Sequence, residues 1–200
     1  MPQRPLRSIA KSEEITHGVS TLENPAILEK LEQSISREEE AMALKIPRCG
    51  RCSAACELMP LASVSGEDGP LKLTLLDLPV FACPKGHKAP VHGDFMLWLI
   101  HEIRAREGQI AAGREQGMIF KKHLCGGCGK DLAPKPKRRQ VFPYELKYED
   151  LAPFKLQIDM PLYKCTACGK EQIRSTKDLH GHVAQAVVGI NDGAGFPHSG

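Results

Sequence analysis

The sequence contains few aromatic residues and no long apolar segment. Aromatic side chains make up 5% of its 200 residues, which favours one or two small globular units over a single large hydrophobic core. The longest apolar run, residues 95–100, is too short to cross a bilayer. Residues 1–14 lack the apolar segment of a secretory leader. We therefore expect a cytoplasmic protein without a membrane role, in which bound metal contributes to stability.

Eight cysteines stand out in this composition, and four of them form two widely separated pairs with the spacing Cys-x2-Cys. Such a turn directs two thiolates toward one point, and two turns together supply the four sulfurs of a tetrahedral structural zinc site. In a reducing compartment this spacing indicates metal binding and not disulfides. The sequence therefore predicts that Cys125, Cys128, Cys165 and Cys168 bind one Zn²⁺ ion.

A second set of donors lies in the first half of the chain. Cys49 and Cys52 form another Cys-x2-Cys pair, and Cys83 and His87 follow later with the spacing Cys-x3-His. Three thiolates and one imidazole also complete a tetrahedral zinc site. His87 stands where the other set has its last cysteine. We therefore predict that these four residues bind a second structural Zn²⁺ ion.

Two further residues are alternative ligands of this site. Cys56 follows the pair at Cys49 closely, and His92 lies further along the chain. The pair and Cys56 together have the spacing Cys-x2-Cys-x3-Cys, which also occurs in iron–sulfur proteins. An iron–sulfur cluster is therefore the alternative to zinc here, although Glu57, and not Pro, follows Cys56. We expect Cys56 to be a small buried apolar side chain.

An internal repeat links the two sets of donors. Residues 76–83 align without a gap with residues 158–165, and Asp, Pro, an aromatic residue and Cys fall in the same places of both. Strands are predicted at residues 71–81, 140–148 and 154–163. Because Pro fits only at a strand edge or a bulge, we expect small open hairpins and no central strand. Asp77 and Asp159 share a place before this Pro, which favours a turn or edge role over catalysis.

Positive charge is concentrated in the last part of the chain. Residues 119–200 contain 13 Lys or Arg against 8 Asp or Glu, a net charge of +5, whereas residues 1–45 and 46–118 carry −2 and 0. The densest group consists of Lys135, Lys137, Arg138 and Arg139. Such a group can contact nucleic-acid phosphates or an acidic protein surface, or it can simply be a solvated loop.

The segment from Cys125 to Gly169 resembles zinc ribbons and, among them, the YgiT (MqsA-type) zinc-finger domain. The likeness rests on the Cys-Gly-Gly-Cys turn, the hairpin, and residues 159–169, in which a strand with Pro leads into Cys-x2-Cys-Gly. The resemblance implies a structural zinc ion and a domain that binds a toxin or precedes a DNA-reading helix-turn-helix. The first module departs from this pattern at His87, and no helix-turn-helix pattern follows the second.

The predicted fold class is α+β, with two small zinc-ribbon β-hairpin modules, each followed by a helix, plus an N-terminal helix. The helices are predicted at 23–46, from Asp94 to about residue 113, and from Thr176, capped by Ser175, to about residue 188. The predicted boundaries are a flexible tail at 1–22, the N-terminal helix at 23–46, the first module with its helix at 47–118, the second module with the C-terminal helix at 119–190, and a flexible tail at 191–200.

The two donor sets are each complete without a solvent ligand, whereas catalytic zinc keeps an open coordination position. We therefore expect a non-enzymatic zinc-binding protein whose tandem ribbons act as a macromolecular interaction or regulatory module. Its partner is an unidentified protein or nucleic acid, and no small-molecule substrate is expected. The first alternative is a nucleic-acid-binding regulator that acts through the basic second module. The second is an iron–sulfur or thiol redox protein.

Overall fold

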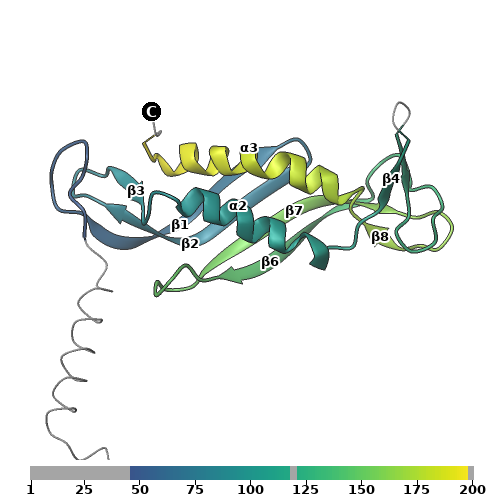
Figure 1. The fold of residues 1–200 in the computed structure, drawn as a ribbon, viewed down its shortest axis with the longest axis horizontal. Coiled ribbons are helices and arrows are strands. Elements are labelled where there is room, and N and C mark those ends of the chain that lie inside the picture. Colours follow the sequence, from purple (N-terminus) through teal and green to yellow (C-terminus); the bar gives the residue numbers. More distant parts are fainter. Residues whose placement is uncertain (1–45, 118–120, 198–200) are drawn as a thin grey trace, which may run out of the picture. The chain divides into compact units, whose positions relative to one another are not determined.

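The computed structural model describes residues 46–117 and 121–197 (Figure 1). The chain divides into two units, Met1–Lys45 and Ile46–Gly200, and only the second is described below. The tail predicted at 1–22 and nearly all of the helix predicted at 23–46 therefore lie outside the described residues. Within the described part the fold is mixed, mostly strands with two α-helices, which agrees with the predicted α+β class. None of its helices has the length and apolar character to cross a membrane.

Four long antiparallel strands form the sheet, in the order β1-β2-β7-β6 (Figure 1). They are β1 (Glu57–Asp68), β2 (Leu71–Ala82), β6 (Arg138–Leu146) and β7 (Phe154–Lys164). Short strands β3 (Lys88–Pro90) and β8 (Glu171–Gln172) extend β2 and β7, and β4 (Arg114–Gln116) pairs with β5 (Lys122–Leu124) separately. The two predicted hairpins are therefore joined into one sheet through β2 and β7.

The contact between β2 and β7 follows the internal repeat. The two copies are offset by 82 positions, the difference between 158 and 76. Leu75 lies opposite Leu156, and Thr74 lies opposite Gln157. In the other copy of the repeat, Leu75 corresponds to Gln157 and Thr74 corresponds to Leu156. Exchanging the two copies therefore turns each of these pairs into the other. The repeats are thus related by a local two-fold axis through the sheet. Because β2 and β7 run antiparallel, the loops that follow them lie at opposite ends of the sheet.

The expectation of open hairpins without a central strand is wrong, because β2 and β7 occupy the two central places. The repeated prolines are nevertheless accommodated at local gaps. Pro79 falls between the part of β2 that pairs with β7 and the part that pairs with β3, and Pro161 falls between the parts of β7 that pair with β2 and β8. Each proline therefore has a neighbouring strand on one side only, where its missing N–H costs no ladder hydrogen bond.

The two helices differ from their predicted lengths. Helix α2 (Phe95–Ala105) ends well before residue 113, and a 3₁₀ turn, Glu107–Gln109, leads into β4. Gly108 breaks the helical pattern here, since Gly disfavours a helix interior. Helix α3 (Thr176–Ala194) begins at the predicted cap, Ser175, but continues through part of the predicted tail to Gly195, whose φ of 73° ends it.

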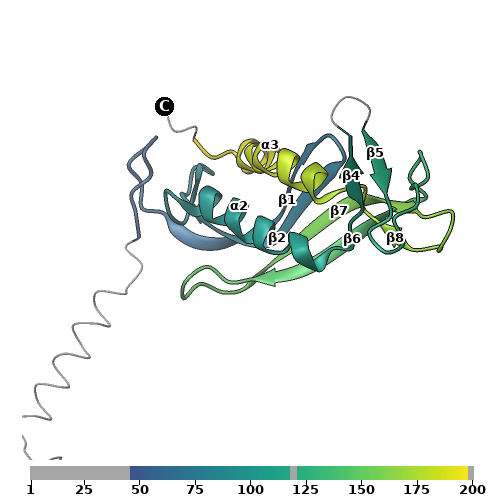
Figure 2. The same ribbon diagram turned by 45° about the vertical axis from the view of Figure 1, so that its right-hand side comes forward.

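Each helix packs on the hairpin of the other repeat, on one face of the sheet (Figure 2). From α2, the Phe95 ring lies 5.2 Å from the Tyr148 ring and 6.0 Å from the Phe154 ring, both in the second hairpin. From α3, the backbone approaches β1 so closely that a Cβ on Gly66 would lie 2.0 Å from the carbonyl oxygen of Ala186. Each helix therefore contacts the hairpin of the other repeat, and these contacts hold the two repeats together.

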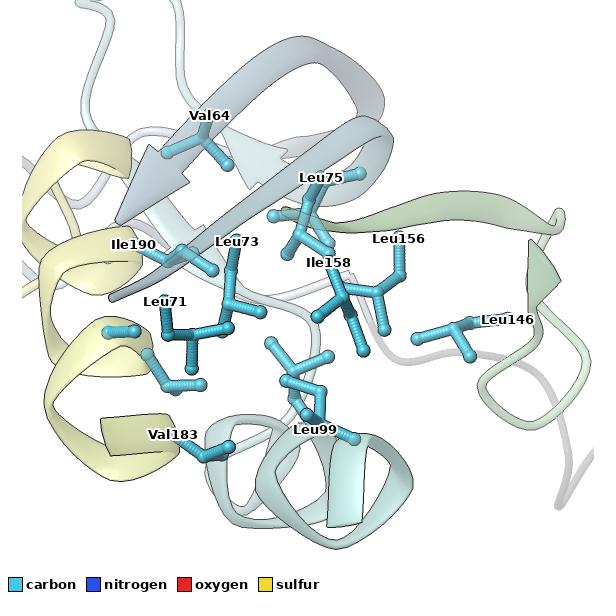
Figure 3. Packing of buried hydrophobic residues seen from close by; sticks show 14 of the residues in the cluster. Val64, Leu71, Leu73, Leu75, Leu99, Leu146, Leu156, Ile158, Val183 and Ile190 are labelled. Carbon is cyan, nitrogen blue, oxygen red and sulfur yellow. The ribbon is translucent and has the colours of Figure 1, made fainter. Parts of the chain in front are cut away.

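The core between the sheet and the helices is one cluster that spans both repeats (Figure 3). Its fully buried members include Leu73 and Leu75 of β2, Ile158 of β7, Leu99 of α2 and Val183 of α3. The expectation that few aromatics prevent a single large core is therefore wrong, because aliphatic side chains fill it. As a division into independently folding units, the predicted boundary at residue 118 stays a prediction.

Candidate metal centres

The structure brings the eight predicted donors together as two groups of four, one beyond each end of the sheet. In each group all donor atoms lie within 4.8 Å of one another. The first group is Cys49, Cys52, Cys83 and His87, and the second is Cys125, Cys128, Cys165 and Cys168. Both groups are able to hold a metal ion. Their roles as ligands stay a prediction, which the donor geometry supports as follows.

The second group has the dimensions of a four-sulfur zinc site. The Sγ atoms of Cys125 and Cys168 are 3.6 Å apart, and those of Cys128 and Cys165 are 3.5 Å apart. A tetrahedron with zinc–sulfur bonds of about 2.3 Å has edges of about 3.8 Å. The first cysteine of each pair is buried and the second is exposed. In each turn, therefore, one thiol lies on the buried side of the common point and the other lies on its solvent side.

The first group fits a site with three sulfurs and one nitrogen. Nδ1 of His87 lies 3.5 Å from the Sγ of Cys49 and 3.6 Å from that of Cys83, while the Sγ atoms of Cys52 and Cys83 are 3.7 Å apart. Zinc bonds of about 2.3 Å to sulfur and 2.0 Å to nitrogen imply a nitrogen–sulfur edge of about 3.5 Å. Nδ1 is therefore the donor atom of His87, and Nε2 is left for another partner.

Backbone amides in the Cys-x2-Cys turns favour the thiolate form of the leading cysteine. The amide of Arg51 is the main group that lowers the pKa of Cys49 to about 6. The amide of Cys128 likewise lowers the pKa of Cys125 to about 6, and the last amide of its own turn lowers that of Cys165. Because the thiolate is the metal-binding form, these amides favour metal binding by the leading sulfur of each turn.

A buried glutamine supports the second group and was missed by the sequence reasoning. Gln172 in β8 is fully buried, and its Oε1 accepts a hydrogen bond of 3.2 Å from the amide of Gly126. A Cβ on Gly126 would lie 2.3 Å from the carbonyl oxygen of Ala112, so this place in the turn requires glycine. The signal in the sequence is a polar residue directly after a metal-binding turn, in a short strand.

Cys56 and His92 stay outside both groups. Cys56 is buried in the same apolar cluster as Cys49 and Cys83, and burial raises the pKa of its thiol. Nδ1 of His92 lies 2.6 Å from the carboxylate of Asp94, on the surface. The first group therefore has four donors without either of them.

The four cations of the basic cluster are partly neutralised by two carboxylates, Glu171 and Asp159. Lys137 and Arg138 share Glu171, at 3.0 and 2.9 Å. Arg139 donates to both carboxylate oxygens of Asp159, at 3.0 and 3.1 Å, which gives that repeated aspartate a structural partner. Of the predicted cluster, only Lys135 has no ion pair with a carboxylate of the described residues. Three of its four cations thus have a carboxylate partner within the protein.

Comparison with known proteins gives no family for the chain. No protein-family model matches it, and no solved structure matches it. Among curated proteins, the acetyl-coenzyme A synthetase of Thiobacillus denitrificans is 64% identical over 33 residues, and that of Cupriavidus taiwanensis is 69% identical over 32 residues. Each match covers 16% of this chain and spans only 5% of the synthetase.

Proposed function

We propose that this chain is a non-enzymatic zinc-binding protein in which two structural zinc ribbons, held at opposite ends of one sheet, form a macromolecular interaction module. The observation that carries the proposal is the pair of four-donor groups, each with all donor atoms within 4.8 Å of one another. Donor sets of four sulfurs, and of three sulfurs with one imidazole, are those of structural zinc. Sulfur-rich tetrahedral sites favour zinc over the hard cations Mg²⁺ and Ca²⁺.

Closed coordination is the reason for proposing a binding role and not catalysis. Catalytic zinc has three protein ligands and an open position for water or substrate, whereas each group here offers four. Structural zinc ions instead hold loops in a fixed shape, and such loops are suited to presenting side chains to a partner. The resemblance to the YgiT zinc-finger domain supports this role. The short match to acetyl-coenzyme A synthetases, 5% of their length, supplies no argument for synthetase chemistry.

Cobalt substitution tests whether the sites are closed. In the Co²⁺-loaded chain we expect the absorption of tetrahedral cobalt–thiolate centres, and we expect this spectrum to stay unchanged when imidazole is added. Cys128→Ala is the matched control, because it removes an exposed donor and opens one position to imidazole. A spectrum of the unaltered chain that responds to imidazole as the control does would show an open site and contradict the proposal.

Salt dependence separates this proposal from a nucleic-acid-binding regulator. Phosphate contacts release counterions, so nucleic-acid binding weakens steeply as salt rises. The ion pairs of Lys137, Arg138 and Arg139 oppose phosphate contacts by the densest basic group of the second module. We therefore expect no salt-sensitive binding of single- or double-stranded oligonucleotides to the zinc-loaded chain. Binding that falls with salt and is lost on exchanging these three cations would favour the regulator instead.

A further inference from the structure

The most unusual surface of the described chain is a cavity beside the first donor group. Its volume is about 280 Å³. It is lined by Pro47, Arg48, Cys49, Gly50, Arg51, Cys56, His87, Lys88, Ala89 and Pro197. The wall therefore combines the ring of a predicted metal ligand, three cationic side chains and several apolar groups. A cavity of about 250 Å³ beside the second donor group also has two cations in its wall, Lys122 and Arg174, but there the wall includes the acidic residue Asp131.

The three cations at this cavity have no carboxylate partner among the described residues. Arg48 donates to the backbone oxygen of Ser53 at 3.4 Å, and no carboxylate of the described ranges forms an ion pair with Arg48, Arg51 or Lys88. This is the reverse of the basic cluster predicted from the sequence, whose cations bind Glu171 and Asp159. Three cations without a carboxylate partner among the described residues therefore gather beside the first donor group.

His87 supplies a directed donor at the same place. Its Nδ1 faces the sulfurs of the first group, so a metal ion bound there leaves Nε2 as an N–H donor. Metal-bound histidines nearly always donate this second N–H to a carboxylate, a carbonyl or water. Among residues 46–117 and 121–197, Nε2 of His87 has no hydrogen-bond partner, and His87 is one of the residues that line the cavity. The site thus offers one donor for which the chain provides no acceptor.

The apolar residues of the cavity wall restrict which anionic ligands can bind there. Pro47 and Pro197 have no amide N–H, and Ala89 and Cys56 add apolar surface. Such a wall suits an apolar side chain and offers little to the sugar and phosphate oxygens of a nucleic acid. A ligand that fits therefore joins a carboxylate to a small apolar group. Peptides in which an apolar residue stands beside acidic residues have this chemistry.

We propose that the cavity at His87 binds an acidic peptide segment of a partner protein, with an apolar side chain on the proline and alanine wall. One carboxylate accepts from Nε2–H of His87, and flanking carboxylates lie near Arg48, Arg51 and Lys88. This inference rests on the proposed function, because the bound metal fixes His87 with its Nδ1 turned inward. It deepens that function by giving the chemistry of the partner.

Titration of the zinc-loaded full chain with synthetic peptides tests the inference. Three short peptides differ only at their centre, which is Leu-Glu-Glu, Leu-Gln-Gln or Gly-Glu-Glu. We expect the first to shift the NMR signals of His87 Nε2–H and of the Ala89 amide, and to bind about tenfold more tightly than either of the others. Inorganic phosphate that shifts the same signals with equal affinity, or three peptides that bind alike, would overturn the proposal.

Variants locate the binding. Arg51→Gln should weaken the Leu-Glu-Glu peptide about threefold, and exchange of Arg48, Arg51 and Lys88 together for Gln should weaken it about tenfold or more. Lys85→Gln is the matched control, since Lys85 lies in the same metal loop but does not line the cavity. Equal losses in the control and the triple variant would contradict the assignment.

Metal analysis of the same samples keeps the two proposals apart. Two zinc ions per chain with no peptide binding would overturn the peptide site alone. A chain that lacks the first metal ion would overturn the proposed function, and the peptide site with it.

Discussion

The two repeats use one scaffold and finish it differently. In both, a strand with an internal proline runs from the middle of the sheet into a turn that carries candidate metal ligands, and a helix then crosses to the other hairpin. The second repeat ends in four sulfurs backed by Gln172, and two cations of its basic cluster, Lys137 and Arg138, pair with Glu171. The first ends in three sulfurs and His87, beside a cavity with unpaired cations. The shared parts build the fold, and the differing parts are where a partner can be selected.

The largest expected effect comes from removing one donor of each candidate metal site, and it is localised to a different end of the sheet in each repeat. Cys165→Ser removes a fully buried donor and should release one metal ion and disorder the turns around β5 and β8. A loss on the order of 5 kcal/mol or more follows from the coupling of zinc binding to folding. Cys83→Ser should release the other ion and disorder the loop at His87 instead. Hydrogen exchange with thermal unfolding measures both.

Cys56→Ser is the control for these variants. It exchanges a buried thiol beside the first group without removing one of the four donors. We expect it to keep both metal ions and to cost about 1 kcal/mol. If it released metal as Cys83→Ser does, Cys56 would be a ligand and the assignment of the first site would be wrong.

The second prediction concerns the helix that holds the second repeat through aromatic rings. Phe95 is almost fully buried and contacts Trp98, Tyr148 and Phe154. Phe95→Ala should lower the free energy of unfolding by about 4 kcal/mol, because it leaves a large cavity between α2 and the second hairpin. Denaturant unfolding measures this, with metal content unchanged. A loss below about 1 kcal/mol would mean that α2 does not clamp that hairpin.

The third prediction concerns the helix that holds the first repeat through close backbone contact. A Cβ on Gly66 would lie 2.0 Å from the oxygen of Ala186 and 2.5 Å from the amide nitrogen of Ile190. Gly66→Ala should therefore push α3 from β1 and cost about 2 kcal/mol. Gly181→Ala is the control: nothing lies within 4 Å of its Cβ, and replacing Gly inside α3 should stabilise by about 1 kcal/mol. Equal effects of the two would contradict the observed contact.

The smallest prediction concerns an ion-pair group of the second repeat. The buried carboxylate of Glu115 lies 2.7 Å from Lys121 and 3.1 Å from Lys177 of α3, and these lysines hold its pKa below the ordinary value. A lowered carboxyl pKa contributes stability that is present above the ordinary value of 4.5 and is lost as pH falls through the lowered one. The contribution is small, since both lysines are exposed and solvent screens their interaction with the carboxylate.

Glu115→Gln measures this contribution. At pH 7 the variant should be slightly less stable than the unaltered chain, and the difference should shrink to nothing as the pH is lowered through the carboxyl range. A difference that grows on acidification would contradict the assigned sign.

Local signals explain how much of this fold can be read from the sequence. The spacing of Cys125, Cys128, Cys165 and Cys168 predicts a grouping that the structure shows, because a Cys-x2-Cys turn constrains its own geometry. The predicted strand at 154–163 agrees with β7 to one residue, since alternation of apolar residues is also local. The repeat itself was visible, but not that its two copies pair with each other.

Contacts between distant segments explain what was missed. Nothing near Leu75 in the sequence says that it lies opposite Leu156, so the shared core was not foreseen. Lys137 and Arg138 look free in the sequence because their partner, Glu171, comes more than thirty residues later. The charge of Arg48, Arg51 and Lys88 is scattered along the chain and becomes a cluster only when the first metal turns fold.

Counting metal ions in the full chain tests the central claim most directly, namely that four donors at each end of the sheet hold one zinc ion. Native mass spectrometry with elemental analysis should find two zinc ions and no iron per chain, and one zinc ion in each of Cys83→Ser and Cys165→Ser. Iron with visible absorption, or two zinc ions retained in either variant, would contradict it.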